Sequence, residues 1–394
     1  MLYSNYNYIE ELIGLKDICV NSIKRENNQL HIDISMPQRP HKCPQCGEIT
    51  SKIHDYRIQS IKDIPLLGEC TILHLRKRRY VCPKCKKRFY EDISFLPKYH
   101  RITNRLAAYV INLLKEVGSI KSVAKAVNLS QTTVTRIFDN VEYSNKTLPR
   151  VISLDEFRGN AGGEKFQCII TDPEHKKVLD ILPNRKAEDL YRYFLKFKER
   201  KMVQYVVIDM SGFYRSLAKC LFPNAKIIAD RYHVVRQVIW AFENVRKNEQ
   251  SKFHDTRRKY FKRSRKLLLK KPENLTEEEA AQVEVMLNTS DRLRQAYRLK
   301  NEFYKFMECK NRDEARKQLG IWNMMAVGYG LPEFEVCTKT FINWSEEILN
   351  SFQYPYSNGY TEGVNNKIKV IKRNAYGIRN FNRFRKRILH VMAQ

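Results

Sequence analysis

The amino-acid sequence predicts a multidomain α+β protein in which two small N-terminal modules precede an α/β core that is interrupted by an all-helical insertion. Three observations predict this organisation: two cysteine pairs at metal-knuckle spacing, a stretch of helical period with a tight turn, and alternating strands and helices after residue 147. A chain of 394 residues can form several domains that each bury a core. In chain order we expect an N-terminal segment of unknown role (1–40), a zinc ribbon (41–98) and a helix-turn-helix domain (99–146). The first part of the core (147–235), the helical insertion (236–350) and the C-terminal helices of the core (351–394) follow.

The charge of the chain indicates a polyanionic partner. Lys and Arg number 72 against 43 Asp and Glu, which gives a formal net charge of +29. Such an excess destabilises a compact protein by self-repulsion unless a polyanion offsets it. The basic residues lie in separate segments, and no apolar run reaches membrane-spanning length, so nucleic acid is favoured over a membrane. Residues 1–20 do not resemble a signal peptide, and we expect a cytoplasmic, nucleoid-associated protein with reduced cysteines.

The first strong motif is a pair of Cys-x-x-Cys turns, each with Pro after its first cysteine. Two strand-like stretches between them, Tyr56–Ile64 and Thr71–Val81, predict a hairpin that brings the turns together. The alternative is two unrelated redox turns, which the repeated pattern disfavours. We expect one structural zinc ion, which supplies much of the folding energy of so small a ribbon. Its expected ligands are Cys43, Cys46, Cys82 and Cys85.

Other residues near the knuckles have weaker signals. Three histidines could replace a cysteine ligand, although four cysteines already complete the shell: His41, His54 and His74. A basic run before the second knuckle is expected to touch phosphate, with a solvated strand edge as the alternative: Arg76, Lys77, Arg78 and Arg79. The isolated cysteines are expected in apolar cores: Cys70, Cys168, Cys220, Cys309 and Cys337.

The next segment has a helical period. Helices are predicted over Thr103–Val117, Ile120–Val127 and from Ser130 or Gln131 to Asn140. Small Ala124 and the apolar turn residue Leu129 match a helix-turn-helix, although an ordinary three-helix bundle is the alternative. The ribbon and the basic charge around it favour DNA binding. The side chains expected to face the major groove are Gln131, Thr132, Thr133 and Arg136.

After residue 149 the pattern is that of an α/β domain. An antiparallel meander is predicted at Arg150–Phe157, Phe166–Thr171 and Lys177–Leu182. Two strands with helical crossovers follow, Tyr205–Asp209 and Ala225–Asp230. This order is that of a ribonuclease H-like sheet, although alternation alone establishes only an α/β class. The segments from His233 to about residue 350 and from Thr361 onward are predicted to be helical.

Three carboxylates stand where they could meet in one cleft. Asp155 and Asp209 end apolar strands, and Glu362 opens a helix. Cutting a phosphodiester requires an activated water and a stabilised leaving oxygen, which about two Mg²⁺ or Mn²⁺ ions on carboxylates provide. Each acid alone could be an ordinary strand-end or helix-dipole carboxylate. The presence of all three in the order strand, strand, helix favours a metal site.

Basic residues surround the last of these acids. Lys369 and Arg373 share a helix face with Glu362 and are expected to bind the DNA backbone. The C-terminal helix has an apolar stripe, and its basic residues outside this stripe are also expected to grip DNA: Arg383, Arg385, Lys386 and Arg387.

Several motifs agree in identity and order with one family. The chain resembles the DDE transposases of bacterial insertion sequences, and more narrowly the ISL-three family, from about residue 40 to its end. The matching motifs are Cys43-Pro-Gln-Cys46, Cys82-Pro-Lys-Cys85, Ser153–Phe157, Val207–Met210, Asp230–Val235 and Ser357–Lys369. The resemblance implies a ribonuclease H-like core split by a helical insertion, with Asp155, Asp209 and Glu362 as the metal ligands.

The resemblance also implies the activity. Such a protein binds terminal inverted repeats in double-stranded DNA, cleaves there, and transfers the strand to target DNA as a homo-oligomer on paired ends. Two other classes remain open: a non-catalytic DNA-binding regulator that uses only the ribbon and the helix-turn-helix, and a structure-selective ribonuclease H-like nuclease.

Three further residues compete with the expected ligands or add to them. Glu156 follows Asp155 on a strand, so the two point to opposite faces, and the family pattern rather than the spacing selects Asp155. Asp230 either caps the helix after it or acts near the DNA together with His233.

Overall fold

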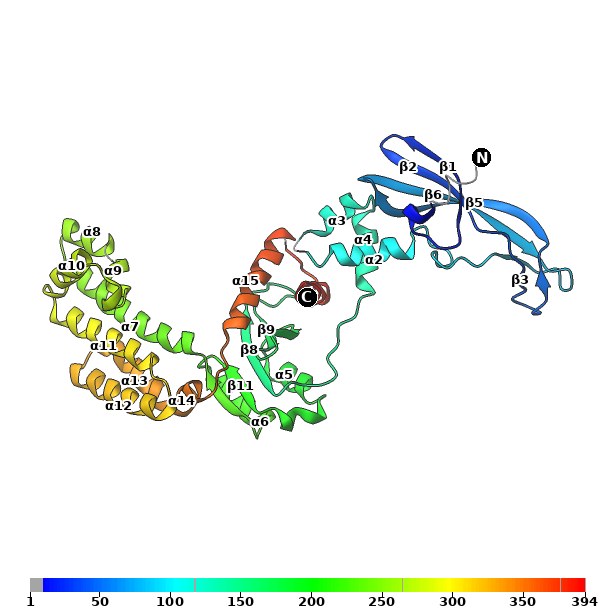
Figure 1. Cartoon of the computed structure of the whole chain (residues 1–394). Helices are drawn as coiled ribbons and strands as arrows, with labels where there is room; N and C mark the ends of the chain where they lie inside the picture. The colour runs from blue at the N-terminus through cyan, green and yellow to red at the C-terminus, as the bar shows by residue number, and fades with distance from the viewer. Residues whose placement is uncertain (1–9, 117, 264, 376, 394) are drawn as a thin grey trace.

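The computed structural model describes residues 10–116, 118–263, 265–375 and 377–393. Figure 1 shows an N-terminal sheet, a small helical module, a central sheet with helices and a helical insertion that follow one another in an extended arrangement. Within the described residues, no helix combines the length and the apolar character needed to cross a membrane.

The N-terminal sheet includes more of the chain than the predicted hairpin. Its strands are β1 (Cys19–Glu26), β2 (Gln29–Ser35), β5 (Ile53–Leu66), β6 (Glu69–Val81) and the short β7 (Arg88–Tyr90). The order is β1-β2-β6-β5, with β2 parallel to β6 and β7 on the far end of β6. Residues 29–35 alternate in polarity as a half-buried strand does, but the parallel pairing of β2 with β6 has no local signal in the sequence. Ile32 and Ile34 bury against Leu73 and Leu75, so the ribbon has an apolar core besides its metal knuckles.

The helical module has the three predicted helices: α2 (Asn104–Leu113), α3 (Ile120–Ala126) and α4 (Gln131–Asp139). Side-chain oxygens of Thr103, Ser119 and Ser130 cap their N-termini. The first helix ends earlier than predicted, at Leu113, and Val117 lies outside the described residues.

The central sheet has the predicted ribonuclease H-like order, β10-β9-β8-β11-β12. Its strands are β8 (Val151–Phe157), β9 (Gln167–Asp172), β10 (Lys177–Leu182), β11 (Tyr205–Ile208) and β12 (Lys226–Ala229). β8, β9 and β10 pair antiparallel, whereas β11 is parallel to both β8 and β12. One face packs on α5 (Ala187–Phe194) and α6 (Gly212–Leu221), and the other on α15 (Gly359–Asn374) and α16 (Phe381–Met392).

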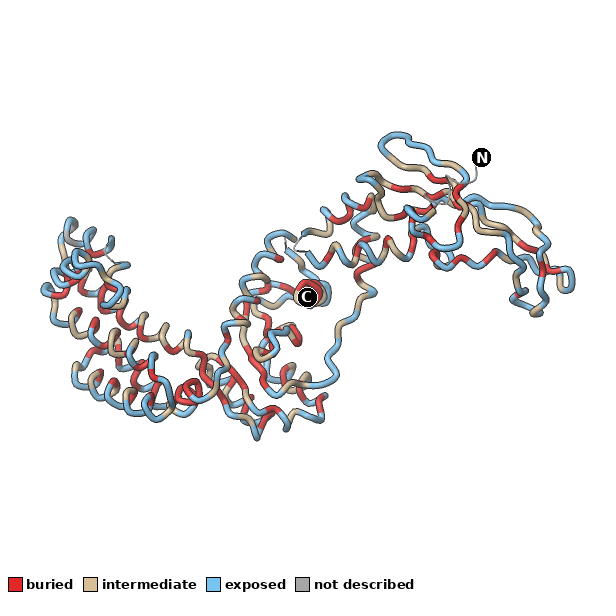
Figure 2. Tube along the Cα trace, viewed as in Figure 1, coloured by how far each residue is buried: buried red, intermediate tan, exposed pale blue. Residues whose placement is uncertain are grey.

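The insertion between β12 and α15 is helical throughout its described residues, as predicted. It contains α7 (Arg231–Ser251), α8 (Asp255–Arg263), α9 (Arg265–Leu269), α10 (Glu277–Leu287), α11 (Asp291–Met307), α12 (Arg312–Tyr329), α13 (Pro332–Asn343), α14 (Ser345–Gln353) and a short 3₁₀ turn, Pro272–Asn274. Figure 2 shows buried residues along the central strands and the inner sides of these helices. The aromatic side chains of Phe303, Trp322 and Phe341 pack together there. The Nδ2 of Asn350 donates to the carbonyl of Ile227 at 2.8 Å, which ties α14 to β12.

The basic side chains of α16 correct one prediction, because they bind the protein itself. Arg383 forms an ion pair with Asp139 of α4 at 2.7 Å, and Arg385 one with Asp180 of β10 at 2.5 Å. Lys386 donates to the carbonyl of Asp139. Arg387 is buried and donates to three carbonyls in the segment between α2 and α3, those of Leu114, Glu116 and Gly118. Helix α16 therefore docks the helix-turn-helix onto the central sheet.

The isolated cysteines follow the prediction with two exceptions. Cys168, Cys309 and Cys337 are buried, whereas Cys70 is half-buried on β6. Cys220 is exposed on α6, because it lies on the side of this helix that turns away from the sheet.

Candidate metal and DNA-binding sites

Three aspartates share one face of the central sheet. On β8, Ile152 and Leu154 face α5 and α6, so Ser153 and Asp155 face α15. The same alternation on β11 and β12 puts Asp209 and Asp230 on the α15 side, after the buried Val207 and Ile228. Glu156 faces the other way, and its Oε2 accepts from Arg185 Nη1 at 2.7 Å. Alternation therefore separates Asp155 from Glu156 and groups it with the acids of the neighbouring strands.

Buried hydroxyls and an amide fix the start of α15 against this face. The Oγ1 of Thr361 lies 3.0 Å from Ser153 Oγ and 2.8 Å from Thr171 Oγ1. Ser153 also donates to Asn358 Oδ1 at 2.5 Å. The backbone N–H of Asn358 donates to Asp230 Oδ1 at 3.2 Å. These contacts place the next residue, Glu362, over the ends of the strands.

The acids of the cleft have raised pKa values, because burial disfavours their charged forms. The pKa of Asp155 is raised to about 6, mainly because the carboxyl is buried, and the nearby charges of Asp209 and Glu362 contribute to this rise. Burial also raises the pKa of Asp209, Asp230 and Glu362. Asp209 Oδ1 and Asp230 Oδ2 are buried without a hydrogen-bond partner among the described residues. Several buried carboxylates that crowd one cleft fit a divalent metal, because hard cations prefer carboxylate oxygens.

The side chains that lie closest together in the cleft include Asp230 and His233, which were expected only as residues that add to the three metal ligands. Ligand atoms of Asp230, His233 and Glu362 all lie within 4.8 Å of one another, and Asp155 and Asp209 border this group without joining it. Asp230 occupies the N-cap position of α7, but its side chain makes no capping hydrogen bond. The backbone N–H groups of Tyr232 and His233 still lower the pKa of this carboxyl, so the start of the helix contributes to its environment.

Three residues of the cleft were missed by the sequence analysis. Asn365 donates from Nδ2 to Asp155 Oδ2 at 2.9 Å, and only its position three residues after Glu362 on one helix could have indicated it. Arg236 and Trp240 of α7 line a small cavity of about 110 Å³ together with Asp209 and His233. The Arg236 guanidinium lies 4.2 Å from the centre of the Trp240 ring.

The structure brings the four predicted zinc ligands together. The Sγ atoms of Cys43, Cys46, Cys82 and Cys85 all lie within 4.8 Å of one another. The two knuckles repeat one backbone pattern. The N–H of Gly47 donates to the carbonyl of Cys43 at 3.0 Å, and the N–H of Lys86 donates to the carbonyl of Cys82 at 3.0 Å. Among the described residues no histidine joins this group, and His74 pairs with His31 through ring nitrogens 2.9 Å apart. Four thiolates in this arrangement fit a tetrahedral zinc ion.

The basic run on β6 is partly used within the ribbon. Arg78 forms an ion pair with Glu91 at 3.2 Å, and Arg79 one with Asp55 at 2.5 Å. Lys77 donates to Gln59 Oε1 at 3.1 Å. Arg76 is exposed and stacks on the Tyr56 ring at 4.0 Å.

The predicted DNA-reading residues lie on an accessible helix. Gln131, Thr132 and Arg136 of α4 are exposed, and Thr133 is half-buried. Lys369 and Arg373 are exposed on α15, where Lys369 donates to Asn366 Oδ1 at 3.0 Å.

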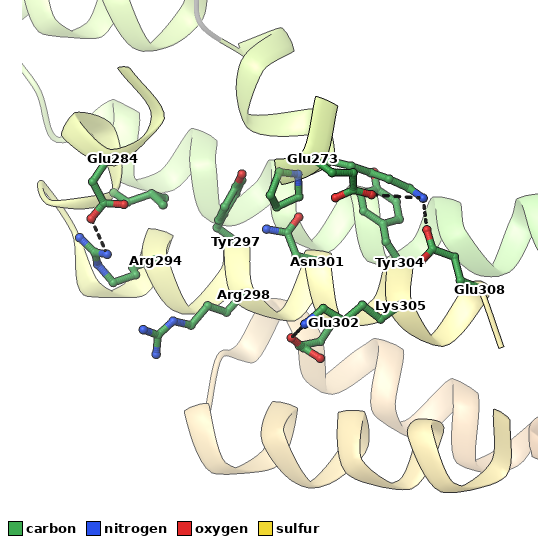
Figure 3. Close-up of a pocket in the computed structure, with 13 residues that line it drawn as sticks. Glu273, Glu284, Arg294, Tyr297, Arg298, Asn301, Glu302, Tyr304, Lys305 and Glu308 are labelled. Atoms are coloured by element: carbon green, nitrogen blue, oxygen red, sulfur yellow. Dashed lines mark hydrogen bonds and ion pairs between the residues drawn. The ribbon is translucent and has the colours of Figure 1, made fainter. Parts of the chain in front are cut away.

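The insertion has a cavity of about 480 Å³ with a different chemistry (Figure 3). Its charges largely pair with one another, as in Glu284 with Arg294 at 2.8 Å and Glu302 with Lys305 at 2.6 Å. The buried Lys300 lies beside it, with Nζ 4.5 Å from the Tyr297 ring centre, and burial lowers the pKa of this amine to about 7. A lining of paired charges offers little to a metal or a polyanion, so the cleft under α15 is the stronger candidate.

Comparison with known proteins identifies the family. A family model described as "Transposase", from the ISL3 family, matches residues 152–388. A model for the helix-turn-helix domain of transposase family ISL3 matches residues 91–141, and one for the zinc-finger of the transposases IS204/IS1001/IS1096/IS1165 matches residues 39–85.

Individual relatives agree with the family models. The transposase for insertion sequence element IS1001 of Bordetella parapertussis is 28% identical over 351 residues, which cover 86% of this chain and 85% of that protein. The transposase for IS1557 of Mycobacterium tuberculosis is 23% identical over 244 residues, or 55% of this chain and 54% of the other. A Drosophila P element transposase strand transfer complex matches with a TM-score of 0.39 and 11% identity over 73% of this chain and 91% of that chain, too weakly to carry an argument. The chain therefore belongs to the ISL3 family of DDE transposases, enzymes that bind, cleave and transfer DNA strands.

Proposed function

We propose that Asp155, Asp209 and Glu362 hold the metal ions with which this transposase cuts the ends of its insertion sequence and joins them to target DNA. The observation that carries the proposal is that all three acids face one cleft, where buried carboxylate oxygens lack protein partners. Bound there, about two Mg²⁺ or Mn²⁺ ions would activate the attacking water or 3′-hydroxyl and stabilise the leaving oxygen.

The surrounding residues would hold these acids in place. Asn365 orients one oxygen of Asp155, and the buried Thr361 fixes the helix turn that carries Glu362. Asp230 and His233 border the same space and would complete its polar wall. Arg236 lies close enough to Glu362 to lower the pKa of this acid, and it would face the phosphate of a bound strand.

The other parts of the chain would deliver DNA to this cleft. We propose that Gln131, Thr132, Thr133 and Arg136 read the terminal inverted repeat, with one structural zinc ion in the ribbon. Arg76, Lys369 and Arg373 would bind backbone phosphates. Pairing two ends for joining favours a homo-oligomer, and we propose that it acts on the nucleoid in the cytoplasm.

Purified protein with Mg²⁺ tests the function on three substrates: a terminal-repeat duplex, an unrelated duplex and a branched duplex. A transposase cuts at the repeat end and joins the freed 3′-hydroxyl to a target plasmid. Cutting of branched DNA without any joining would favour the nuclease, and repeat binding without metal-dependent cleavage would favour the regulator.

The contact between Asn365 and Asp155 predicts a positioning effect. Asn365→Ala should lower the rate of end cleavage by about 10- to 100-fold, because loss of a contact that orients a metal ligand has this effect. Repeat binding in a gel-shift assay should be unchanged. Raising the Mn²⁺ concentration should recover part of the cleavage rate. An unchanged cleavage rate of Asn365→Ala at low metal concentration would show that Asn365 does not position Asp155.

A further inference from the structure

A groove of about 790 Å³ separates the N-terminal sheet from the predicted recognition helix α4. Its lining includes Ser60 and Lys62 of the sheet, Tyr99 and Arg101 of the connecting loop, and Thr133 and Arg136 of α4. We propose that this groove seats the DNA duplex next to the segment read by α4. In this arrangement Arg101 contacts a backbone phosphate and the Tyr99 ring contacts a base or sugar of the flanking step. The inference rests on the DNA-binding function proposed above and extends it to residues outside the recognition helix α4.

Charge on the walls of the groove favours DNA as its occupant. Lys62, His100, Arg101 and Arg136 line it, and no acidic residue does so among the described residues. Arg101 and Arg136 are exposed and have no ion-pair partner in the described part of the chain. Arg105 and Arg383 are used differently, because they pair with the carboxylates of Asp63 and Asp139. Two unpaired guanidinium groups on one groove, one from the connecting loop and one from α4, complement the charge of a backbone that crosses from one to the other.

The two walls of the groove are joined rigidly. Asp63 of β5 is only 2% exposed, and it accepts hydrogen bonds from Thr103 Oγ1 at 2.6 Å and Arg105 Nε at 2.8 Å. The backbone of Lys62 pairs with the connecting loop. Its N–H donates to the Arg101 carbonyl at 2.9 Å, and its carbonyl accepts from the Thr103 N–H at 3.1 Å. Lys62 Nζ reaches the carbonyl of Asn128, in the turn before α4, at 2.6 Å. The sheet is therefore held in one orientation to α4, and the groove exists before DNA binds, which lowers the entropic cost of binding.

Tyr99 occupies a turn position that requires a positive φ. His100 N–H donates to the Pro97 carbonyl at 3.1 Å, which makes Pro97–His100 a tight turn with Tyr99 at its third position. Tyr99 has a φ of 65°, in the left-handed region where such turns normally place Gly or Asn. Its side chain is 97% exposed, so no packing within the chain compensates for the strain. Strained residues of this kind concentrate at functional sites, and an exposed ring between two basic walls suits contact with a base or sugar.

Two variants of the full-length protein test the groove on a duplex that carries the terminal repeat and its flanks. Tyr99→Gly relieves the strained φ, so the melting temperature should not fall, while affinity should drop by about two- to tenfold because one aromatic contact with the DNA is lost. Hydroxyl-radical footprinting should show protection lost on the flank only. Arg101→Ala should reduce the slope of log affinity against log salt by about one, because one phosphate contact is removed.

The controls separate this inference from the proposed function. Arg298→Ala removes the same charge from an exposed position on α11 of the insertion and should change neither slope nor footprint. Arg136→Ala should weaken binding at the repeat itself. If Arg136→Ala loses the repeat while Tyr99→Gly and Arg101→Ala keep wild-type affinity and footprint, the groove proposal is wrong and the function stands. If the wild-type protein protects neither repeat nor flank, both proposals fail.

Discussion

Asp209→Asn should remove strand cutting and strand joining together, lowering both rates by about a thousandfold, because the metal site would lose several kcal/mol of charge stabilisation. Asp209 follows β11 near the centre of the sheet, and its Oδ1 is buried without a protein partner. Asparagine keeps the size of the side chain but removes the charge that holds a dication. Cleavage of labelled repeat DNA and its transfer to a plasmid measure the two steps, and a gel-shift assay should show repeat binding within about twofold of wild type.

A matched control for this substitution lies on the opposite face of the same sheet. Glu156 faces away from α15 and forms an ion pair with Arg185 that is partly exposed. Glu156→Gln should therefore leave both rates within about twofold, since an exposed ion pair contributes little to stability. Wild-type rates in Asp209→Asn, or an equal loss in Glu156→Gln, would show that the acids have been assigned to the wrong face.

The second large effect concerns the cysteine site. Cys82→Ser should abolish zinc binding and unfold the knuckles at residues 41–50 and 82–90, because a four-thiolate zinc site contributes apparent binding energies of about 10–16 kcal/mol in small zinc domains. The strands β2, β5 and β6 should stay folded, because Ile32, Leu73 and Leu75 bury against one another away from the metal. Metal analysis and hydrogen exchange measure the two parts separately.

Cys70 provides the control for the zinc site. It is half-buried on β6 and lies outside the four-sulfur group, so Cys70→Ser should retain about one zinc per chain. Zinc retained at this level in Cys82→Ser, or folded knuckles in metal-free protein, would contradict the assignment.

The features that the sequence predicted depend on local patterns. The cysteine spacing identifies the knuckles, and short apolar runs that end in an acid identify β8 and β11, whereas the family resemblance selects Asp155 over Glu156. The features that it missed depend on contacts between distant segments. Parallel pairing of β2 with β6 and the ion pair of Arg383 with Asp139 join segments whose sequences carry no mutual signal. The charges of α16 therefore resembled a DNA-binding surface in the sequence, although they fasten one domain to another.

The central claim is that Asp155, Asp209 and Glu362 hold the catalytic metal, whereas the ligand atoms that lie closest together among the described residues of the cleft are those of Asp230, His233 and Glu362. Anomalous diffraction from crystals of the protein with terminal-repeat DNA and Mn²⁺ distinguishes these sets directly. We predict anomalous peaks at coordination distance, about 2.1 Å, from carboxylate oxygens of Asp155, Asp209 and Glu362. Metal held by Asp230, His233 and Glu362 alone, with Asp155 and Asp209 uncoordinated, would contradict the assignment.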